Sequence, residues 1–166
     1  MSILYLVCGP PFSGKTTLAK KIAQITGCTY ISTDDIMRKK GFDLSKINPV
    51  EEWEKTHQTC FKMLNELMDK NLTIVLDDTN SLKKLRNRFR YIAQNHKYDV
   101  ITIFMDISLN ELENRRKGDY KHDRVNLSDE AFYPIVKEFE NPDENENTLI
   151  FRASDNIDSW ISQNIQ

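Results

Sequence analysis

The residues with the clearest chemical pattern lie near the start of the chain. Positions 9 to 16 read Gly-Pro-Pro-Phe-Ser-Gly-Lys-Thr, a complete G-x-x-x-x-G-K-[ST] phosphate-binding loop. Lys15 supplies a positive charge for the β- and γ-phosphates, and the Thr16 hydroxyl can bind Mg²⁺. The pattern predicts a site for ATP, or another nucleoside triphosphate, together with Mg²⁺. The residues expected to contact the nucleotide are Gly9, Pro10, Pro11, Phe12, Ser13, Gly14, Lys15, Thr16 and Thr17.

A pair of carboxylates, Asp34 and Asp35, follows the apolar run 28–32. Transfer of a phosphoryl group to an alcohol needs a group that accepts the hydroxyl proton and holds the oxygen in line. We interpret Asp34 as this base, with Asp35 as the alternative, and we expect Asp35 and Arg38 to contact the substrate. The competing interpretation is that one of the two carboxylates only caps the short helix predicted over 34–40.

A second pair of carboxylates, Asp77 and Asp78, follows the continuous apolar run 72–76. An acid at the end of such a strand can hold a Mg²⁺-bound water or orient the acceptor. We assign Asp77 to the metal, together with Thr16, and place Asp78 and Asn80 at the catalytic and substrate side. The alternative is that this segment only caps the helix that begins near Leu82.

Basic residues form two further groups. Arg115, Arg116 and Arg124 bracket a polar stretch, and we predict a mobile lid over about 115–127 that closes arginines onto the phosphates. A solvated charged loop is the alternative. The predicted helix 82–95 carries Lys83, Lys84, Arg86, Arg88 and Arg90. These cations favour either a solvated helix face or a track for a phosphate-rich substrate, and both remain open.

Apolar runs alternate with amphipathic patterns along the whole chain. We predict strands over 3–8, 28–32, 72–76, 100–105 and 148–151. We predict helices over 14–26, 34–40, 82–95, 129–139 and 156–164, one that Asn48-Pro49 opens and Asn71 closes, and one that Ser108 opens. This order predicts a three-layer α/β domain, a parallel sheet with helices on both faces. Ligands bind outside the carboxyl ends of the strands in such sheets, where the loop and both aspartate pairs would meet.

The totals set few further limits. The 166 residues fit one domain over 1–166, and the net charge of -2 leaves room for a local basic patch. The cysteines have no metal-ligand spacing and are expected to be buried free thiols. His57 lies on the apolar stripe of its helix, so we expect a core or half-buried histidine. No targeting or membrane-spanning segment is evident, which predicts a cytoplasmic protein, while the oligomeric state stays open.

The assembled pattern resembles the polynucleotide-kinase-like family of P-loop kinases, which includes the kinase domain of phage polynucleotide kinase and the seryl-tRNA(Sec) kinases. The resemblance extends from Ile3 to about Asn147. It rests on the phosphate loop, on S-T-D-D-I-M-R, on I-V-L-D-D-T-N followed by Arg86, on L-E-N-R-R-K and on F-E-N-P-D-E-N-E-N.

The resemblance implies a P-loop kinase fold and a role for particular residues. It implies that Lys15 and Thr16 serve ATP and Mg²⁺, and that Asp34 is the general base. Asp78 would orient the base or an active-site arginine, Arg115 or Arg116 would stabilise the transferring phosphate, and Arg86 and Arg124 are placed at the substrate. The phage enzyme has an arginine three residues after its base that contacts the phosphate of the acceptor. Here that position is Met37, and Arg38 lies one place later, rotated by about 100° on a helix.

The sequence therefore predicts Mg²⁺-dependent transfer of the ATP γ-phosphate to a hydroxyl, with the 5′-hydroxyl of DNA or RNA as the expected acceptor. One alternative is a small-molecule kinase that acts on a nucleoside, nucleotide or sugar. A second is an accessory ATPase that binds tRNA or a protein and phosphorylates neither.

Overall fold

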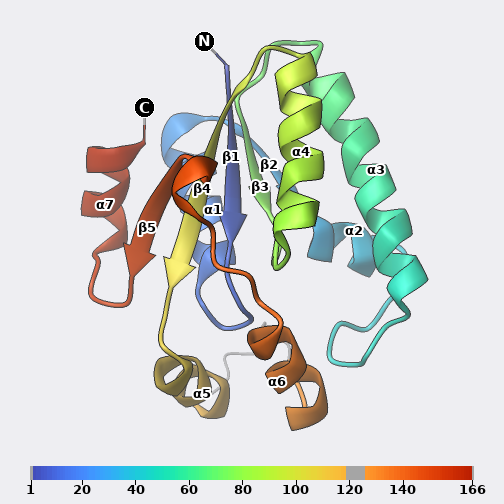
Figure 1. Ribbon diagram of the computed structural model, residues 1–166, viewed down its shortest axis with the longest axis vertical. Coiled ribbons are helices and arrows are strands. Elements are labelled where there is room, and N and C mark those ends of the chain that lie inside the picture. The colour runs from blue at the N-terminus through green and yellow to red at the C-terminus, as the bar shows by residue number, and fades with distance from the viewer. Residues whose placement is uncertain (1, 119–125, 166) are drawn as a thin grey trace.

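The computed structural model of the protein describes residues 2–118 and 126–165. Within them, one sheet of five parallel strands has the order β2-β3-β1-β4-β5 (Figure 1). The strands are β1 Ile3–Cys8, β2 Thr29–Ser32, β3 Ile74–Asp77, β4 Asp99–Asp106 and β5 Thr148–Arg152. Asp77 is in register with Val7 on one side and with Ser32 on the other. The carboxyl ends of the three neighbouring strands β2, β3 and β1 therefore meet at one edge.

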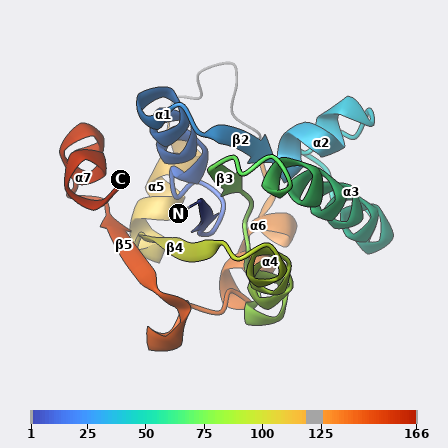
Figure 2. The ribbon, with the colours of Figure 1, turned by 90° about the horizontal axis from the view of Figure 1, so that it is seen from above.

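Helices connect the strands and form the outer layers. They are α1 Lys15–Thr26, α2 Thr33–Lys39, α3 Val50–Met68, α4 Lys83–Asn95, α5 Leu109–Lys117, α6 Asp129–Lys137 and α7 Ile157–Asn164, with a 3₁₀ turn η1 at Glu144–Glu146. Viewed from above, α1 and α7 lie on one face of the sheet, and α3 and α4 lie on the other (Figure 2). This arrangement confirms the predicted three-layer α/β fold.

The strand β1 supplies both cores because its side chains alternate between the two faces of the sheet. Tyr5 and Val7 pack with α1 and α7 in one apolar cluster. Leu4 and Leu6 pack with α3 and α4 in the other. All four side chains are fully buried. Because β1 is buried on both faces, it gives the loop that follows it a rigid support.

One predicted helix start needs a correction. Pro49, not Asn48, is the N-cap of α3. The Asn48 side chain instead donates hydrogen bonds to the carbonyls of Asp43 and Lys46, at 3.0 Å each. The loop before the helix therefore uses the asparagine amide. The predicted cap at Ser108 is confirmed, since its hydroxyl accepts from the Glu111 N–H.

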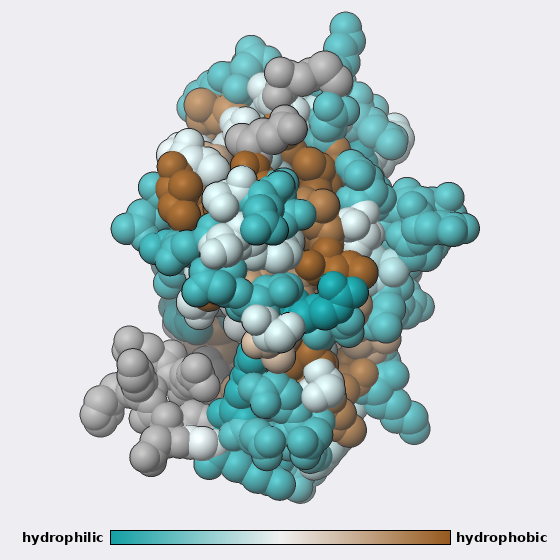
Figure 3. All heavy atoms as spheres, turned by 90° about the vertical axis from the view of Figure 1, so that its left-hand side faces the viewer, coloured by the Kyte–Doolittle hydropathy of each residue, from teal (hydrophilic) through white to brown (hydrophobic). Residues whose placement is uncertain are grey.

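Polar side chains cover most of the face on the α7 side, with some apolar ones between them (Figure 3). Among the residues that the structure describes, no helix is both long enough and apolar enough to cross a lipid bilayer.

Candidate functional site

The phosphate loop lies between β1 and α1 and is tied to the end of β3. The Gly9 N–H donates to the Thr79 carbonyl at 3.1 Å. A Cβ atom at Gly9 would lie only 2.7 Å from both Met105 Cβ and Ser13 Oγ, so only glycine fits at this position. Gly14, with a φ of 90°, makes the left-handed turn that starts α1. The backbone of the loop therefore requires glycine at both positions, as the motif predicts.

Three buried polar oxygens at this edge have no hydrogen-bond partner among the described residues. They are Ser13 Oγ, Asp77 Oδ1 and Asn80 Oδ1. An unsatisfied buried acceptor costs free energy unless a ligand, ion or water completes it. Asn80 is otherwise well fixed, because its side-chain amide donates to the Val7 carbonyl at 2.9 Å. These oxygens have the chemistry of groups that receive a metal-bound water or a ligand hydroxyl.

The residues at the loop suit Mg²⁺ with a nucleotide better than a metal held by protein alone. In residues 2–118 and 126–165 there is no group of three or more His, Cys, Asp or Glu side chains that could enclose a metal ion. Mg²⁺ usually takes one or two protein oxygens and completes its shell with phosphates and water. Asp77 Oδ1 and the Thr16 hydroxyl fit that pattern, and Tyr30 donates to the other oxygen of Asp77 at 2.8 Å.

Asp34 occupies the first turn of α2, directly after β2, and is half-buried. Burial raises the pKa of the Asp34 carboxyl above its ordinary value, the Lys15 charge opposes this rise, and the charges of Asp78 and Asp77 add to it. The cap of α2 is Ser32, whose hydroxyl accepts from the Asp35 N–H at 3.2 Å. The interpretation of the first aspartate pair as side-chain caps is therefore wrong. The local structure leaves the Asp34 carboxylate available for another role.

Asp35 and Arg38 lie beside Asp34 but bind each other. Arg38 Nη1 donates to Asp35 Oδ1 at 2.9 Å, and both side chains are exposed. Met37 is fully buried, and Thr56 on α3 donates to its sulfur at 3.0 Å. The position at which the phage kinase has its acceptor-binding arginine is thus part of the core. The predicted substrate residues Asp35 and Arg38 thus form an exposed ion pair with each other.

Asp78 is buried and has a partner on each carboxylate oxygen. Thr33 Oγ1 donates to Oδ1 at 2.6 Å, and His57 Nε2 lies 3.2 Å from Oδ2. Burial alone would raise the pKa of Asp78. The hydrogen bond with His57, the charge of His57 and the hydrogen bond from Thr33 instead hold that pKa below its ordinary value. Neither partner could be predicted from the sequence, where the one relevant signal is the position of His57 on an apolar helix stripe.

The two lid arginines have different surroundings. Arg115 reaches the phosphate loop, where its Nη1 lies 3.5 Å from the Phe12 carbonyl and 3.2 Å from the Ser13 carbonyl. Arg116 forms an ion pair with Asp129 and stacks over the Phe132 ring at 4.6 Å. Arg115 is therefore the arginine that faces the loop. The predicted contact of Arg124, and residues 119–125 of the lid predicted over about 115–127, lie outside the described residues.

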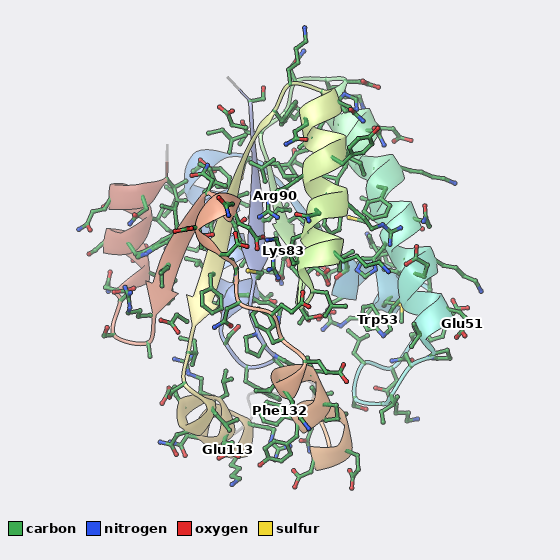
Figure 4. The ribbon with its side chains drawn as sticks, viewed as in Figure 1. Glu51, Trp53, Lys83, Arg90, Glu113 and Phe132 are labelled. Atoms are coloured by element: carbon green, nitrogen blue, oxygen red, sulfur yellow. The ribbon has the colours of Figure 1, made fainter. Side chains whose placement is uncertain are left out.

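Four of the five cations of α4 pair with acids of the protein itself. Arg88 donates to both carboxylate oxygens of Glu54, at 3.0 and 2.7 Å. Lys83 forms an ion pair with Asp143. Figure 4 shows Lys83 and Arg90 on the side of α4 that faces the chain leading into β5. Arg90 pairs with Glu146, at 2.7 Å.

Arg86 has the most buried place on this helix, with no exposed surface. Its Nε and Nη2 donate to the two carboxylate oxygens of Glu146, at 2.8 and 2.9 Å. Its Nη1 donates to the Asn80 carbonyl, also at 2.8 Å. The predicted substrate contact of Arg86 is therefore wrong, because its side chain is fully buried. Arg86 instead supports the backbone that carries Asn80.

The opposite pKa directions of two aspartates lead to a stability prediction. Folding raises the pKa of Asp34, so its favourable contribution is complete below the unfolded-state pKa of about 3.9 and is lost as the pH rises through the folded-state value. Folding lowers the pKa of Asp78, so its contribution is present above the unfolded-state value and is lost as the pH falls through the folded-state value.

At pH 7 we therefore expect Asp34→Asn to raise the Tm and Asp78→Asn to lower it. The Asp78→Asn change should lower the free energy of unfolding by about 1–3 kcal/mol. Thermal unfolding at pH 7 checks the signs. Repeating it at pH 4 should bring the Tm of Asp34→Asn closer to that of the wild-type protein, because the folded state then holds more of Asp34 protonated. The Tm difference of Asp78→Asn should persist, because pH 4 still lies above the lowered folded-state pKa of Asp78. If both variants lose stability equally at pH 7, the proposed charge environment of Asp34 is wrong.

Comparisons with known proteins fit this geometry. A model of the AAA domain family matches residues 4–142. A shikimate kinase from Histophilus somni (strain 2336) is 33% identical over 86 residues, which make up 51% of this chain and 49% of that protein. The chain thus aligns with about half the length of this curated relative.

Solved structures share the fold at low sequence identity. A sugar kinase from Janibacter sp. HTCC2649 has a TM-score of 0.75 at 13% identity and covers 98% of this chain and 92% of its own. Kti12 from Chaetomium thermophilum, solved with ADP-AlF3, also has a TM-score of 0.75, at 17% identity, covering 96% of this chain and 94% of its own.

Proposed function

Because the chain belongs to the AAA domain family, whose model covers residues 4–142, we propose that it is an ATP-dependent kinase that phosphorylates a hydroxyl group of a small molecule. The observation that carries this proposal is the position of Asp34. Its half-buried carboxyl lies in the first turn of α2, and the charge of Lys15 in the phosphate loop acts on it. A base beside the phosphates is what transfer to an alcohol requires and what nucleotide binding alone does not.

In this proposal the residues of the loop hold the nucleotide and Asp34 prepares the acceptor. The loop N–H groups and Lys15 bind the phosphates, and Thr16 with Asp77 would hold Mg²⁺. Bound Mg²⁺ would neutralise phosphate charge as the γ-phosphoryl group leaves ATP. Asp34 accepts the proton of the attacking hydroxyl, and Arg115 contributes positive charge at the loop.

Two features favour a small acceptor over the predicted 5′-hydroxyl of a nucleic acid. Binding along a phosphate backbone depends on cations that are free to neutralise it. Four of the five cations on α4 instead pair with Glu54, Asp143 and Glu146. The position of the acceptor-binding arginine in phage polynucleotide kinase is here the buried Met37. The shikimate and sugar kinases among the matched proteins are named for small hydroxyl compounds, which supports the same choice.

We further propose that residues 1–166 form one kinase domain and that the protein works in the cytoplasm. Cys8 and Cys60 are buried free thiols, and Cys28 is a half-buried one. Unpaired thiols are typical of a reducing compartment.

An acceptor assay with γ-labelled ATP and Mg²⁺ tests the proposed function. The panel contains shikimate, hexoses, nucleosides, and DNA and RNA oligonucleotides with 5′-hydroxyl ends. We expect a labelled small-molecule phosphate with the wild-type protein and none with Lys15→Ala, because this variant lacks the charge that binds the β- and γ-phosphates.

Other distributions of the label contradict the proposal in distinct ways. Label on oligonucleotides alone would restore the nucleic-acid acceptor. Release of labelled inorganic phosphate that a tRNA pool or a protein partner stimulates, without a labelled acceptor, would favour the accessory ATPase.

A further inference from the structure

The contact between His57 and Asp78 joins α3 to the edge of the sheet that carries the site. The side chain of His57 is 13% exposed and that of Asp78 is 7% exposed. His57 Nε2 lies 3.2 Å from Asp78 Oδ2, and Thr33 Oγ1 donates to Asp78 Oδ1 at 2.6 Å. The three side chains form a chain of hydrogen bonds from α3 through the end of β3 to the start of α2. Thr33 is the residue immediately before Asp34.

The imidazole of His57 is held in one orientation by aromatic neighbours. Its ring stacks on Phe61 with a centroid distance of 6.5 Å and meets the edge of Phe89 at 6.2 Å. Because the carboxylate of Asp78 only accepts, the hydrogen bond requires a proton on His57 Nε2. The ring therefore presents a fixed donor to Asp78.

Packing alone does not account for this contact. A position on an apolar stripe of α3 is filled without cost by an apolar side chain, whereas a buried carboxylate is costly unless both oxygens are satisfied. Here the partners of Asp78 come from two different helices, and one of them adjoins Asp34. The charge of Asp78 also acts on the Asp34 carboxyl. Asp78 is thus linked to Asp34 both through its hydrogen bond with Thr33 and through its charge.

We propose that His57 is a positioning residue of the phosphoryl-transfer site: its Nε2–H fixes the Asp78 carboxylate, which through Thr33 holds the first turn of α2 and Asp34 in place for the acceptor hydroxyl. This inference rests on the proposed function. It assigns His57 no contact with the substrate and no proton transfer. His57 acts by geometry, and a displacement of a reacting group by about 1 Å can cost about 10²-fold in rate.

The kinetic test compares His57→Phe with His57→Gln, using γ-labelled ATP and whichever compound of the acceptor panel the wild-type protein phosphorylates. We expect His57→Phe to lower kcat by about 10- to 100-fold with an unchanged Kd for the nucleotide, because the donor to Asp78 is lost. His57→Gln keeps an N–H donor and should recover most of the rate. Thr33→Val removes the other hydrogen bond to Asp78 and should lower kcat in the same way.

A double variant separates positioning from a general structural role. In the Asp34→Asn background the His57→Phe change should cost less than about threefold, because residues that act as one unit are not additive. The control is His96→Gln. His96 follows α4 and contacts Asn65 and Asp69 near the carboxyl end of α3, away from Asp78, so this substitution should leave kcat unchanged.

The contact itself is tested without any activity, by ¹⁵N NMR of the histidine side chains. A protonated Nε2 on His57 is expected in the wild-type protein, with a signal that shifts in Asp78→Asn. Full activity of His57→Phe, or equal losses with and without Asp34, would overturn the inference and leave the proposed function standing. A wild-type protein that labels no acceptor would overturn both.

Discussion

Asp34→Asn should lower kcat for phosphoryl transfer by about 10²- to 10⁴-fold, which is the usual contribution of a positioned general base. The amide has nearly the shape of the carboxylate but cannot accept the hydroxyl proton. Asp34 is half-buried in the first turn of α2, and Ser32 rather than Asp34 caps this helix, so the change should leave the local fold intact. Steady-state kinetics with labelled ATP, together with the Kd for the nucleotide from calorimetry, measure the effect.

The neighbouring residue provides the control for this experiment. Asp35 has the same side chain but is exposed and binds Arg38 at 2.9 Å. Asp35→Asn should therefore change kcat by less than about threefold, since an exposed ion pair contributes little. An equal loss in both variants would move the role of the base away from Asp34 alone. A loss of nucleotide affinity in Asp34→Asn would instead indicate a role in binding ATP.

Arg86→Met should lower the free energy of unfolding by about 3–5 kcal/mol, the usual cost of breaking a buried ion pair. The side chain of Arg86 is fully buried and that of Glu146 is 3% exposed, and their two hydrogen bonds measure 2.8 and 2.9 Å. Without Arg86, the Glu146 carboxylate keeps Arg90 as its one cationic partner within residues 2–118 and 126–165. The Asn80 carbonyl also loses a donor. Urea denaturation of the variant and the wild-type protein measures the difference.

Two controls distinguish an ion-pair effect from a packing effect. Lys83→Met breaks the exposed pair with Asp143 on the same helix and should cost about 0–1 kcal/mol. The double variant Arg86→Met/Glu146→Leu should recover much of the stability, because an apolar pair of similar volume can replace a buried ion pair. If Arg86→Met costs no more than Lys83→Met, the pair does not support the site.

The parts of the site that follow from local patterns could be predicted from the sequence. The phosphate loop is a contiguous motif, and each aspartate pair directly follows an apolar strand. The parallel sheet then brings these strand ends together, as the register of Val7, Asp77 and Ser32 shows. The fold and the location of the site were thus predictable.

The partners of these residues were not predictable, because they lie far apart in the chain. Tyr30 is 47 residues from Asp77, His57 is 21 residues from Asp78, and Arg86 is 60 residues from Glu146. No periodicity or short motif encodes such pairs. The basic run on α4 illustrates the consequence: the sequence left a solvated face and a substrate track open, whereas the structure pairs most of the run with acids of distant segments.

The most direct test of the central claim is the chemical fate of the γ-phosphate in the presence of the small-molecule acceptor panel. We expect the wild-type protein to form a labelled phosphate ester, and Asp34→Asn to bind Mg²⁺ and ATP equally well but form almost none. A wild-type protein that only binds ATP, or releases the label as inorganic phosphate, would contradict the account. So would an Asp34→Asn variant that forms the ester at the wild-type rate.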